Sequence, residues 1–309
     1  MSVRPFPVTP ELTAIAIAYR NERLIADDVL PRVPVGRKDF RWRKYALADS
    51  FTLPDTTVGR KSQPNQVEFG FTEETDSAVD YGLDDTIPND DIQQAPPNYN
   101  PEGRAVEMIM QLIALDREVR AANLIFNASS YATANKVTLS GTSQWSDFTN
   151  SDPIAAIQSG MDSMIMRGNI MVIGRVAFSS LVRHPKIVKA ANRNQGDSGI
   201  VRRQDLAELL ELDDVIVGEG WRNTAKKGQT PTMTRVWGKH AAILYRDRTA
   251  STTSGLTFGY TVQTGTRVAG SIPEPKVGLR GSVLVRAGET VKEIIAANDL
   301  GYFFQNAVA

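Results

Sequence analysis

Only one short segment of this chain has the residue types that nucleophilic catalysis requires. Ser198 follows Asp197 between two glycines, and this Gly-Asp-Ser-Gly order carries the nucleophile in one group of serine proteases. Those enzymes continue with Gly-Pro, whereas Ile200 and Val201 follow here, and the upstream His184 is too near to leave room for a segment with the triad acid. We therefore predict a loop, and a cytosolic serine hydrolase using Ser198 is kept as a distant alternative.

Sequence signatures of metal, cofactor and thiol chemistry are also missing. The chain holds two histidines, His184 and His240, too few for the usual histidine-rich transition-metal site. The acidic residues between positions 80 and 91 do not follow the alternating Asp spacing of a calcium loop. There is no cysteine, no phosphate-binding loop and no His-Glu-x-x-His motif. We predict that the protein is not an enzyme and has no catalytic residues, no metal and no cofactor.

Charge is distributed unevenly between residues 37 and 91, although the chain as a whole has 35 basic and 35 acidic residues. Residues 55–91 hold ten acidic residues against Arg60 and Lys61, and five cations crowd into residues 37–44. A segment this acidic requires a basic partner, so we predict that copies of the chain satisfy one another's charges. The candidate subunit-interface residues are Arg37, Lys38, Arg41, Arg43, Lys44, Glu73, Glu74, Asp76, Asp84, Asp85, Asp90 and Asp91.

A second, smaller basic group is a candidate for contact with DNA. Arg183, Lys186, Lys189 and Arg193 lie three and four residues apart, so they fit one helix face, and such a face binds phosphates with an affinity that salt weakens. No aromatic residues that would stack on bases are interleaved, and a solvated helix surface remains the alternative. Because the net charge is zero, any DNA contact is expected to be local and weak.

Length and composition indicate a folded protein of roughly two domains. The 309 residues are 41% hydrophobic, which is enough for a real core. No run approaches the roughly 18 apolar residues of a membrane helix, and the prolines at 5, 7 and 10 argue against a signal peptide. We expect a soluble protein made in the cytosol, with no membrane partner.

The predicted elements place these residues on arms around a mixed body. Thr9-Pro10-Glu11 predicts a helix over 11–26, and the alternation of residues 40–45 predicts a strand that pairs with a second near 66–72. Asn100-Pro101-Glu102 opens the strongest helix, 101–127, which has a long apolar stripe. Further strands are expected at 137–139, 170–173, 215–217, 258–262, 276–285 and 302–304, with a hairpin of 233–237 and 241–245 around Gly238-Lys239.

With its predicted helices and strands in this order, the chain resembles the major capsid proteins of tailed bacteriophages, whose shell fold is shared with encapsulins. The resemblance covers essentially the whole chain and is carried locally by the segments 100–104 (NPEGR), 169–174 (NIMVIG), 214–218 (DVIVG) and 236–245 (VWGKHAAILY). It implies an α+β fold with an N-terminal arm, an extended loop, a peripheral domain built on a spine helix, and a mixed α/β axial domain. The corresponding boundaries are 1–45 for the arm, 46–98 for the extended loop, 99–150 for the peripheral domain, 151–268 for the axial domain and 269–309 for C-terminal strands that return to the peripheral domain.

The same resemblance implies a structural function. Proteins of this kind self-assemble as hexamers and pentamers into an icosahedral head that encloses double-stranded DNA, so we expect a virion protein assembled in the host cytoplasm. Portal, scaffolding and decoration proteins are the expected partners beside copies of the chain, and packaged DNA makes weak, nonspecific contact. An encapsulin-type nanocompartment subunit is the main alternative, and the contents of the particle separate the two.

Overall fold

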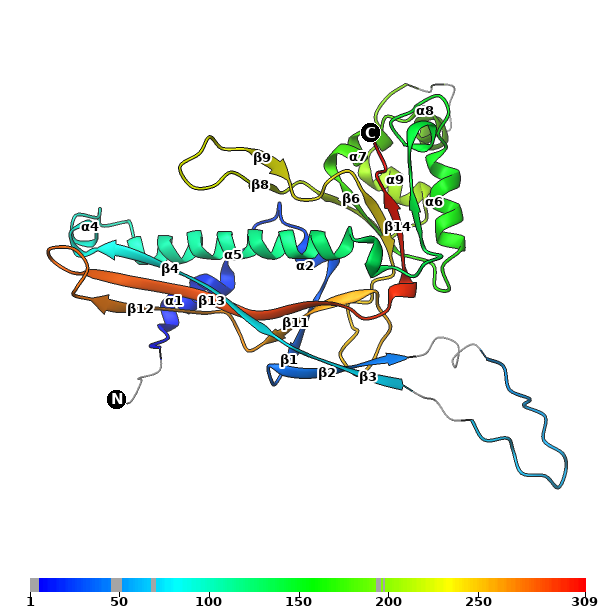
Figure 1. The fold of residues 1–309 in the computed structure, drawn as a ribbon, viewed down its shortest axis with the longest axis horizontal. Coiled ribbons are helices and arrows are strands. Elements are labelled where there is room, and N and C mark those ends of the chain that lie inside the picture. The colour runs from blue at the N-terminus through cyan, green and yellow to red at the C-terminus, as the bar shows by residue number, and fades with distance from the viewer. Residues whose placement is uncertain (1–5, 46–51, 68–70, 193–195, 197) are drawn as a thin grey trace.

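The computed structural model describes residues 6–45, 52–67, 71–192, 196 and 198–309, and these form an elongated molecule with two mixed lobes and projecting hairpins (Figure 1). The two lobes share one long helix, α5, which runs from Pro101 to Ile125. Its start follows the predicted capping chemistry, because the Asn100 side chain accepts a hydrogen bond from the Gly103 N–H at 3.0 Å and proline occupies the first turn. The predicted spine helix is thus confirmed to within two residues.

The first lobe is a five-stranded sheet covered by α5 and by the N-terminal helix α1 (Figure 1). The long strand β13 lies at its centre. It pairs with β12 over residues 282–288 and with β4 over residues 282–291, and its last part, residues 291–295, pairs with β11, to which β1 adds in parallel. Leu12 of α1, Ile109 of α5 and Val285 of β13 meet in its core. The elements are α1 (Pro10–Ala18), α2 (Ala26–Val29), β1 (Arg32–Val35), β4 (Val79–Pro88), α4 (Asn89–Gln93), β11 (Gly259–Thr264), β12 (Val268–Glu274) and β13 (Ser282–Ile295).

The second lobe is a five-stranded sheet in the order β5-β14-β10-β6-β7. In β6 and β7, alternate side chains face opposite layers: Met171 and Val215 pack under the lobe's helices, whereas Ile170 and Ile216 pack in the layer that includes Trp237 and the end of α5. The strands are β5 (Lys136–Thr138), β6 (Ile170–Gly174), β7 (Asp214–Gly218), β10 (Ala241–Leu244) and β14 (Gly301–Gln305). The helices are α6 (Pro153–Asp162), α7 (Arg175–Leu181), α8 (Pro185–Asn192) and α9 (Arg203–Leu209), with short 3-10 turns at Ala128–Ser130, Gly141–Ser143 and Asn298–Leu300.

Two small two-stranded sheets project from these lobes. Strand β2 (Asp39–Tyr45) pairs with β3 (Phe71–Ser77), and β8 (Trp221–Asn223) pairs with β9 (Met233–Arg235). Within the described part of the chain, no helix is both long enough and apolar enough to cross a membrane.

Several local predictions were wrong. The predicted hairpin of 233–237 with 241–245 does not form, because β10 is fully buried between β6 and β14 and β9 pairs with β8 instead. The turn signal at Gly238 was real, but four consecutive apolar residues are better buried on both faces of a central strand.

The other differences concern where elements begin and end. The partner of the strand over 40–45 is β3 at 71–77 rather than 66–72, and residues 68–70 lie outside the described chain. The first helix stops at Ala18 rather than 26. The strand expected over 276–285 instead begins at Ser282, after a turn in which Gly278 and Gly281 have φ of 77° and 78°, a region that favours glycine.

Candidate assembly surfaces

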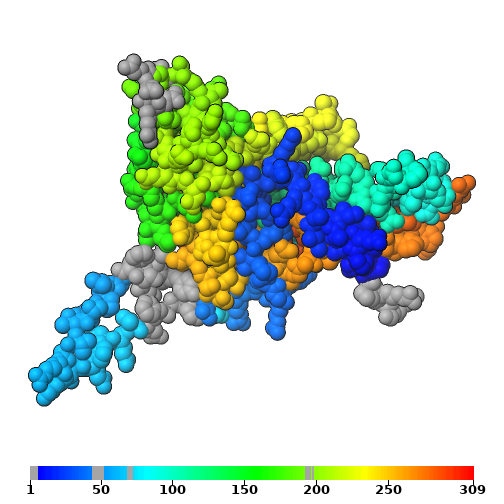
Figure 2. Space-filling view, turned by 180° about the vertical axis from the view of Figure 1, so that it is seen from behind, coloured from blue at the N-terminus to red at the C-terminus, as the bar shows by residue number. Residues whose placement is uncertain are grey.

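Residues 52–67 form an extended segment that reaches far beyond the body of the molecule (Figure 2). Every residue in it is exposed, and the side chain of Leu53 is 90% exposed. Its described hydrogen bonds stay within the segment, such as Asn65 Nδ2 donating to the Asp55 carbonyl at 2.9 Å. A segment that buries no apolar surface has nothing to offset the conformational entropy that it loses when it becomes ordered. This segment is therefore suited to pack on another molecule.

The structure brings the predicted basic and acidic groups together within one chain. Arg41 on β2 bonds Glu73 on β3 at 3.2 Å, and Lys38 bonds Asp80 at the start of β4. The acidic residues farther along have partners on β13 or next to it. These pairs are Lys292 with Asp76 at 3.2 Å, Arg286 with Asp84 at 2.6 Å and Arg280 with Asp90 at 3.0 Å.

These contacts reduce the charge left for neighbouring copies. Hydrogen bonds from Lys38 and Thr290 lower the pKa of Asp80, and a hydrogen bond from Arg286 lowers the pKa of Asp84. Among the described side chains of the candidate set, those that are exposed and have no ion pair are Arg37, Glu74, Asp85 and Asp91. Arg43 donates its backbone N–H to the Thr252 carbonyl at 3.1 Å, and the side chain of Lys44 is outside the described part.

The candidate DNA-facing cations do not form one continuous helix face. Arg183 precedes α8 and donates its Nε to the Ser179 carbonyl at 2.8 Å, and Lys186 pairs with Asp152 at 3.0 Å. Lys189 is exposed and has no ion pair to another described residue. Arg193 lies outside the described residues.

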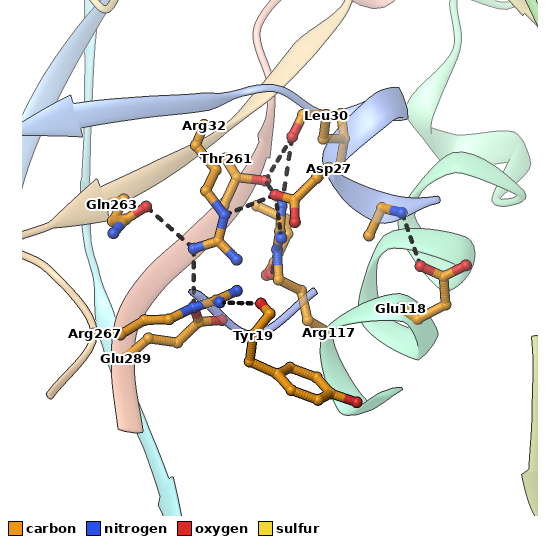
Figure 3. Close-up of polar contacts among 12 residues, drawn as sticks. Tyr19, Asp27, Leu30, Arg32, Arg117, Glu118, Thr261, Gln263, Arg267 and Glu289 are labelled. Atoms are coloured by element: carbon orange, nitrogen blue, oxygen red, sulfur yellow. Dashed lines mark hydrogen bonds and ion pairs between the residues drawn. The ribbon is translucent and has the colours of Figure 1, made fainter. Parts of the chain in front are cut away.

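A buried ionic junction, which sequence reasoning missed, fixes the N-terminal segment to α5 and the first sheet (Figure 3). The Glu289 carboxylate on β13, only 1% exposed, accepts hydrogen bonds from Arg32 at 2.8 Å and Arg267 at 3.1 Å. Burial raises the pKa of Glu289, but the charges of Arg32 and Arg267 more than offset this, so its pKa is lowered. Arg267 also donates to the carbonyls of Ala16 and Tyr19 at 3.1 and 2.9 Å, which holds the end of α1.

The spine helix contributes two adjacent buried charges to the same region. Arg117 donates to Asp27 at 2.5 Å and to the Thr261 hydroxyl at 3.0 Å. Glu118 accepts the backbone N–H groups of Ile25 and Ala26 at 3.0 and 2.8 Å and also the indole N–H of Trp237. Together they join the N-terminal segment to both lobes.

The sequence did contain a signal for this junction. Arg117 occupies the helical position between Ile113 and Ala121, four residues from each, where an apolar residue is expected. A charge inside an apolar stripe indicates either a buried partner or a break in the helix.

The structure also separates the two residues of the hydrolase alternative. His184 is fully buried, with Nε2 3.0 Å from the Ser151 hydroxyl and Nδ1 accepting the Lys186 N–H at 3.3 Å, and burial lowers its pKa. Ser198 is exposed and has no described contact with it. Among the residues described, no cluster of His, Asp and Glu has the arrangement of a metal site.

Comparison with solved structures defines the class of protein that has this fold. A phage-related protein from Bordetella bronchiseptica RB50 aligns over 98% of this chain and 99% of its own, with a TM-score of 0.78 at 22% identity. An encapsulin complex of Synechococcus elongatus PCC 7942 aligns over 99% and 92%, with a TM-score of 0.53 at 11% identity. The capsid of cyanophage P-SCSP1u aligns over 93% of this chain and 89% of its own, with a TM-score of 0.61 at 10% identity. The predicted α+β fold of phage capsid and encapsulin shells is therefore confirmed.

Sequence comparison gives the family within that class. The family model for phage major capsid protein E matches residues 129–259. Over all 309 residues the chain is 57% identical to the major capsid protein of Pseudomonas phage JBD67, with complete coverage of both chains. The chain belongs to the phage major capsid protein family, and its role is structural. This membership favours the phage capsid over the encapsulin alternative.

Proposed function

We propose that this chain self-assembles into the icosahedral head shell of a tailed phage and encloses its double-stranded DNA. Hexamers and pentamers of the chain, assembled in the host cytoplasm, are the proposed capsomers. The observation that carries the proposal is the extended segment 52–67, exposed along its whole described length. Capsid arms and loops add contact area beyond that of a compact subunit, so the total interface is expected to exceed the usual 1,200–2,000 Å².

The direct test is negative-stain microscopy of the purified recombinant chain. We expect closed shells from the wild type, and none from a variant in which residues 52–67 are replaced by a short Gly-Ser linker. The matched measurement is circular dichroism, which should be nearly unchanged because the segment contributes no buried contact to the body. A compact monomer at all concentrations, seen by small-angle scattering, would contradict the proposal.

Reversing the basic strand tests whether its charge acts between copies. We expect Arg41, Arg43 and Lys44 changed together to Glu to hinder assembly, with largely native circular dichroism. Because Arg41 already pairs with Glu73 in the same chain, part of the effect will come from repulsion within β2–β3. Normal particles from this variant would refute a role of the strand in assembly.

The contents of the particle test the remaining parts of the proposal. Nuclease-protected duplex DNA inside shells from phage-infected cells is the expected result, and protein cargo would indicate the encapsulin alternative. Lys189 and its neighbours on α8 are proposed as weak contacts to that DNA, and portal, scaffolding and decoration proteins as further partners.

A further inference from the structure

The β8–β9 hairpin and the spine helix α5 enclose a groove that the proposed function does not use. The hairpin leaves the second lobe and runs beside α5 (Figure 1), and the groove between them has a volume of about 460 Å³. The base of the hairpin is fixed, because Trp237 is buried and the Val236 N–H donates to the Gly220 carbonyl at 2.9 Å. The groove therefore has two firm walls.

The wall formed by α5 is apolar although it faces solvent. Leu112 lines the groove and is 53% exposed, and Met108, one turn earlier, is 44% exposed. The half-buried Leu115 continues this row at a spacing of three and four residues, which places the three side chains on one face of the helix. Large apolar side chains that gather on a surface in this way indicate a binding site for another protein.

The wall formed by the hairpin is apolar in the same way. Trp221 lines the groove and is 47% exposed, and Met233 is 54% exposed. Because Met233 pairs with Asn223, two residues along the strand from Trp221, both apolar side chains lie on the same face of the hairpin. This face, and not a strand edge, lines the groove, so a partner meets side chains rather than free backbone groups.

The groove is positively charged. Among the described residues that line it, Glu219 is the one acidic side chain, and it already pairs with Arg175 at 2.9 Å. Arg23 and Arg235 also line the groove, and neither forms an ion pair with another described residue. This charge favours a partner that is negative. The rest of residues 220–239 adds the cations Arg222, Lys226, Lys227 and Lys239 and no acidic residue.

The two features together define the shape and charge of the occupant. A groove with apolar side chains on both walls fits the apolar stripe of an amphipathic helix. Methionines on such walls adapt to different apolar partners. The cations around the groove fit carboxylates on the polar face of that helix.

Segments of a second copy of the chain fit this groove less well. The extended segment 52–67 has exposed apolar side chains, but its charged residues are Asp55, Arg60 and Lys61, so its net charge has the same sign as the groove. Apart from α5 itself, the described helices that expose a large apolar side chain are α1 and α7. Helix α1 has one acidic residue and α7 has none, so neither is an acidic amphipathic helix.

We infer that the groove between α5 and the β8–β9 hairpin binds an amphipathic helix with an acidic polar face, supplied by a different protein. The inference rests on the proposed shell function for its meaning, since it gives a separate assembly protein a docking surface on the subunit. Duplex DNA would match the cations but would leave the row at Leu112 without an apolar partner.

A synthetic peptide tests the apolar part of the site. The probe is a fluorescein-labelled amphipathic helix of about 18 residues, with leucines three and four residues apart and glutamates on the other face. Its anisotropy should show saturable binding to the unassembled full-length subunit, and Leu112→Ser or Trp221→Ala should weaken binding by roughly 10- to 30-fold, as at well-packed anchors of other interfaces. The control is Ile165→Ser, also 53% exposed but outside the groove, which should leave the affinity within about twofold of wild type. Circular dichroism melting confirms that each variant is folded.

A second comparison tests the charge. A peptide with lysine in place of every glutamate should bind at least about tenfold more weakly than the acidic peptide. Arg23→Gln with Arg235→Gln should weaken binding of the acidic peptide by roughly fivefold and reduce its dependence on salt. Equal affinity of the two peptides would contradict the assigned charge.

The remaining outcomes overturn the inference in distinguishable ways. Absence of saturable binding, or binding that the Leu112 and Trp221 variants leave unchanged, would show that the groove is not the site. Tighter binding of a peptide of residues 52–67 would assign the groove to a second copy, and displacement of the acidic peptide by a short DNA duplex would assign it to nucleic acid. Failure of the wild type to form shells would contradict the proposed function, whereas the peptide result is measured on the unassembled subunit and does not depend on shells.

Discussion

Replacing Glu289 by Gln gives the sharpest test of the buried ionic junction. The substitution preserves shape and one acceptor oxygen but removes the charge between Arg32 and Arg267. Each charge-assisted hydrogen bond contributes about 1.5–3 kcal/mol, against roughly 0.5–1.5 kcal/mol for a neutral one. Removing one partner of a buried ion pair costs about 3–5 kcal/mol in other proteins, because the remaining charge is left without compensation. Since Arg32 keeps Asp27 as a second partner at 2.7 Å, we expect the free energy of unfolding to fall by about 2–4 kcal/mol.

The pH dependence of the free energy of unfolding gives a second, independent test of this prediction. The pKa of Glu289 is lowered from its ordinary 4.5 in the folded chain, so the unfolded chain binds this proton more readily. The stabilisation from ionised Glu289 is therefore complete above about pH 4.5 and is lost as the pH falls from there through the folded pKa. The Gln variant has no such proton to bind. The difference in free energy of unfolding between wild type and variant should thus be greatest near neutral pH and shrink below pH 4.5.

The measurement is urea unfolding of the unassembled subunit, followed by circular dichroism at several pH values between 3 and 7. Glu73→Gln is the matched control, because Glu73 also pairs with an arginine but at a solvated site, where an ion pair contributes about 0–1 kcal/mol. Equal effects of the two substitutions at pH 7 would refute the reasoning. So would a difference between wild type and the Glu289 variant that grows in acid.

Three further predictions concern close packing, a buried hydrogen bond and an exposed ion pair. Gly218→Ala would place its Cβ 2.1 Å from Trp237 Cγ and should sharply lower the yield of soluble protein, whereas Gly36→Ala, with no atom within 4 Å of its Cβ, should match wild type in the same expression test. Trp237→Phe removes one of the three donors to Glu118 and should lower the free energy of unfolding by about 1–3 kcal/mol, measured by urea titration; a change below about 0.5 kcal/mol would contradict the hydrogen bond. Arg286→Gln breaks an exposed pair with Asp84 and should cost no more than about 1 kcal/mol in the same titration, so a larger loss would show that this site is not solvated in the subunit.

Local features of the sequence were sufficient to predict the spine helix and the buried strands. Asn100 and Pro101 set the start of α5 through capping and a fixed φ, and both act within one turn of the helix. The apolar runs at β6, β7 and β10 likewise need no distant information to indicate burial. These predictions hold because each depends on residues that are neighbours in the chain.

Strand pairing and buried charge could not be predicted in the same way. Whether Ala241 pairs across a tight turn or with Ile173, far away in sequence, depends on which sheet offers burial on both faces. The strand β4 resembles a polar loop in sequence because eight of its ten residues are exposed and three of these are aspartates, and its pairing with β13 is what makes it a strand. Arg117 and Glu118 have hydrogen-bond partners about 90 residues away in the chain, so the sequence around them does not indicate which residues those partners are.

The chain therefore uses charge in two physically different ways. At the junction, charges are removed from water, where the desolvation cost is high and each partner is needed, and this suits a fixed attachment of the N-terminal segment to the body. On the β8–β9 hairpin the charges remain solvated, and an exposed charge of this kind contributes little to stability by itself. In the proposed shell, each weak contact would be repeated many times, so closure of the shell would supply the stability that a single exposed pair lacks, while the buried junction holds each subunit in one geometry.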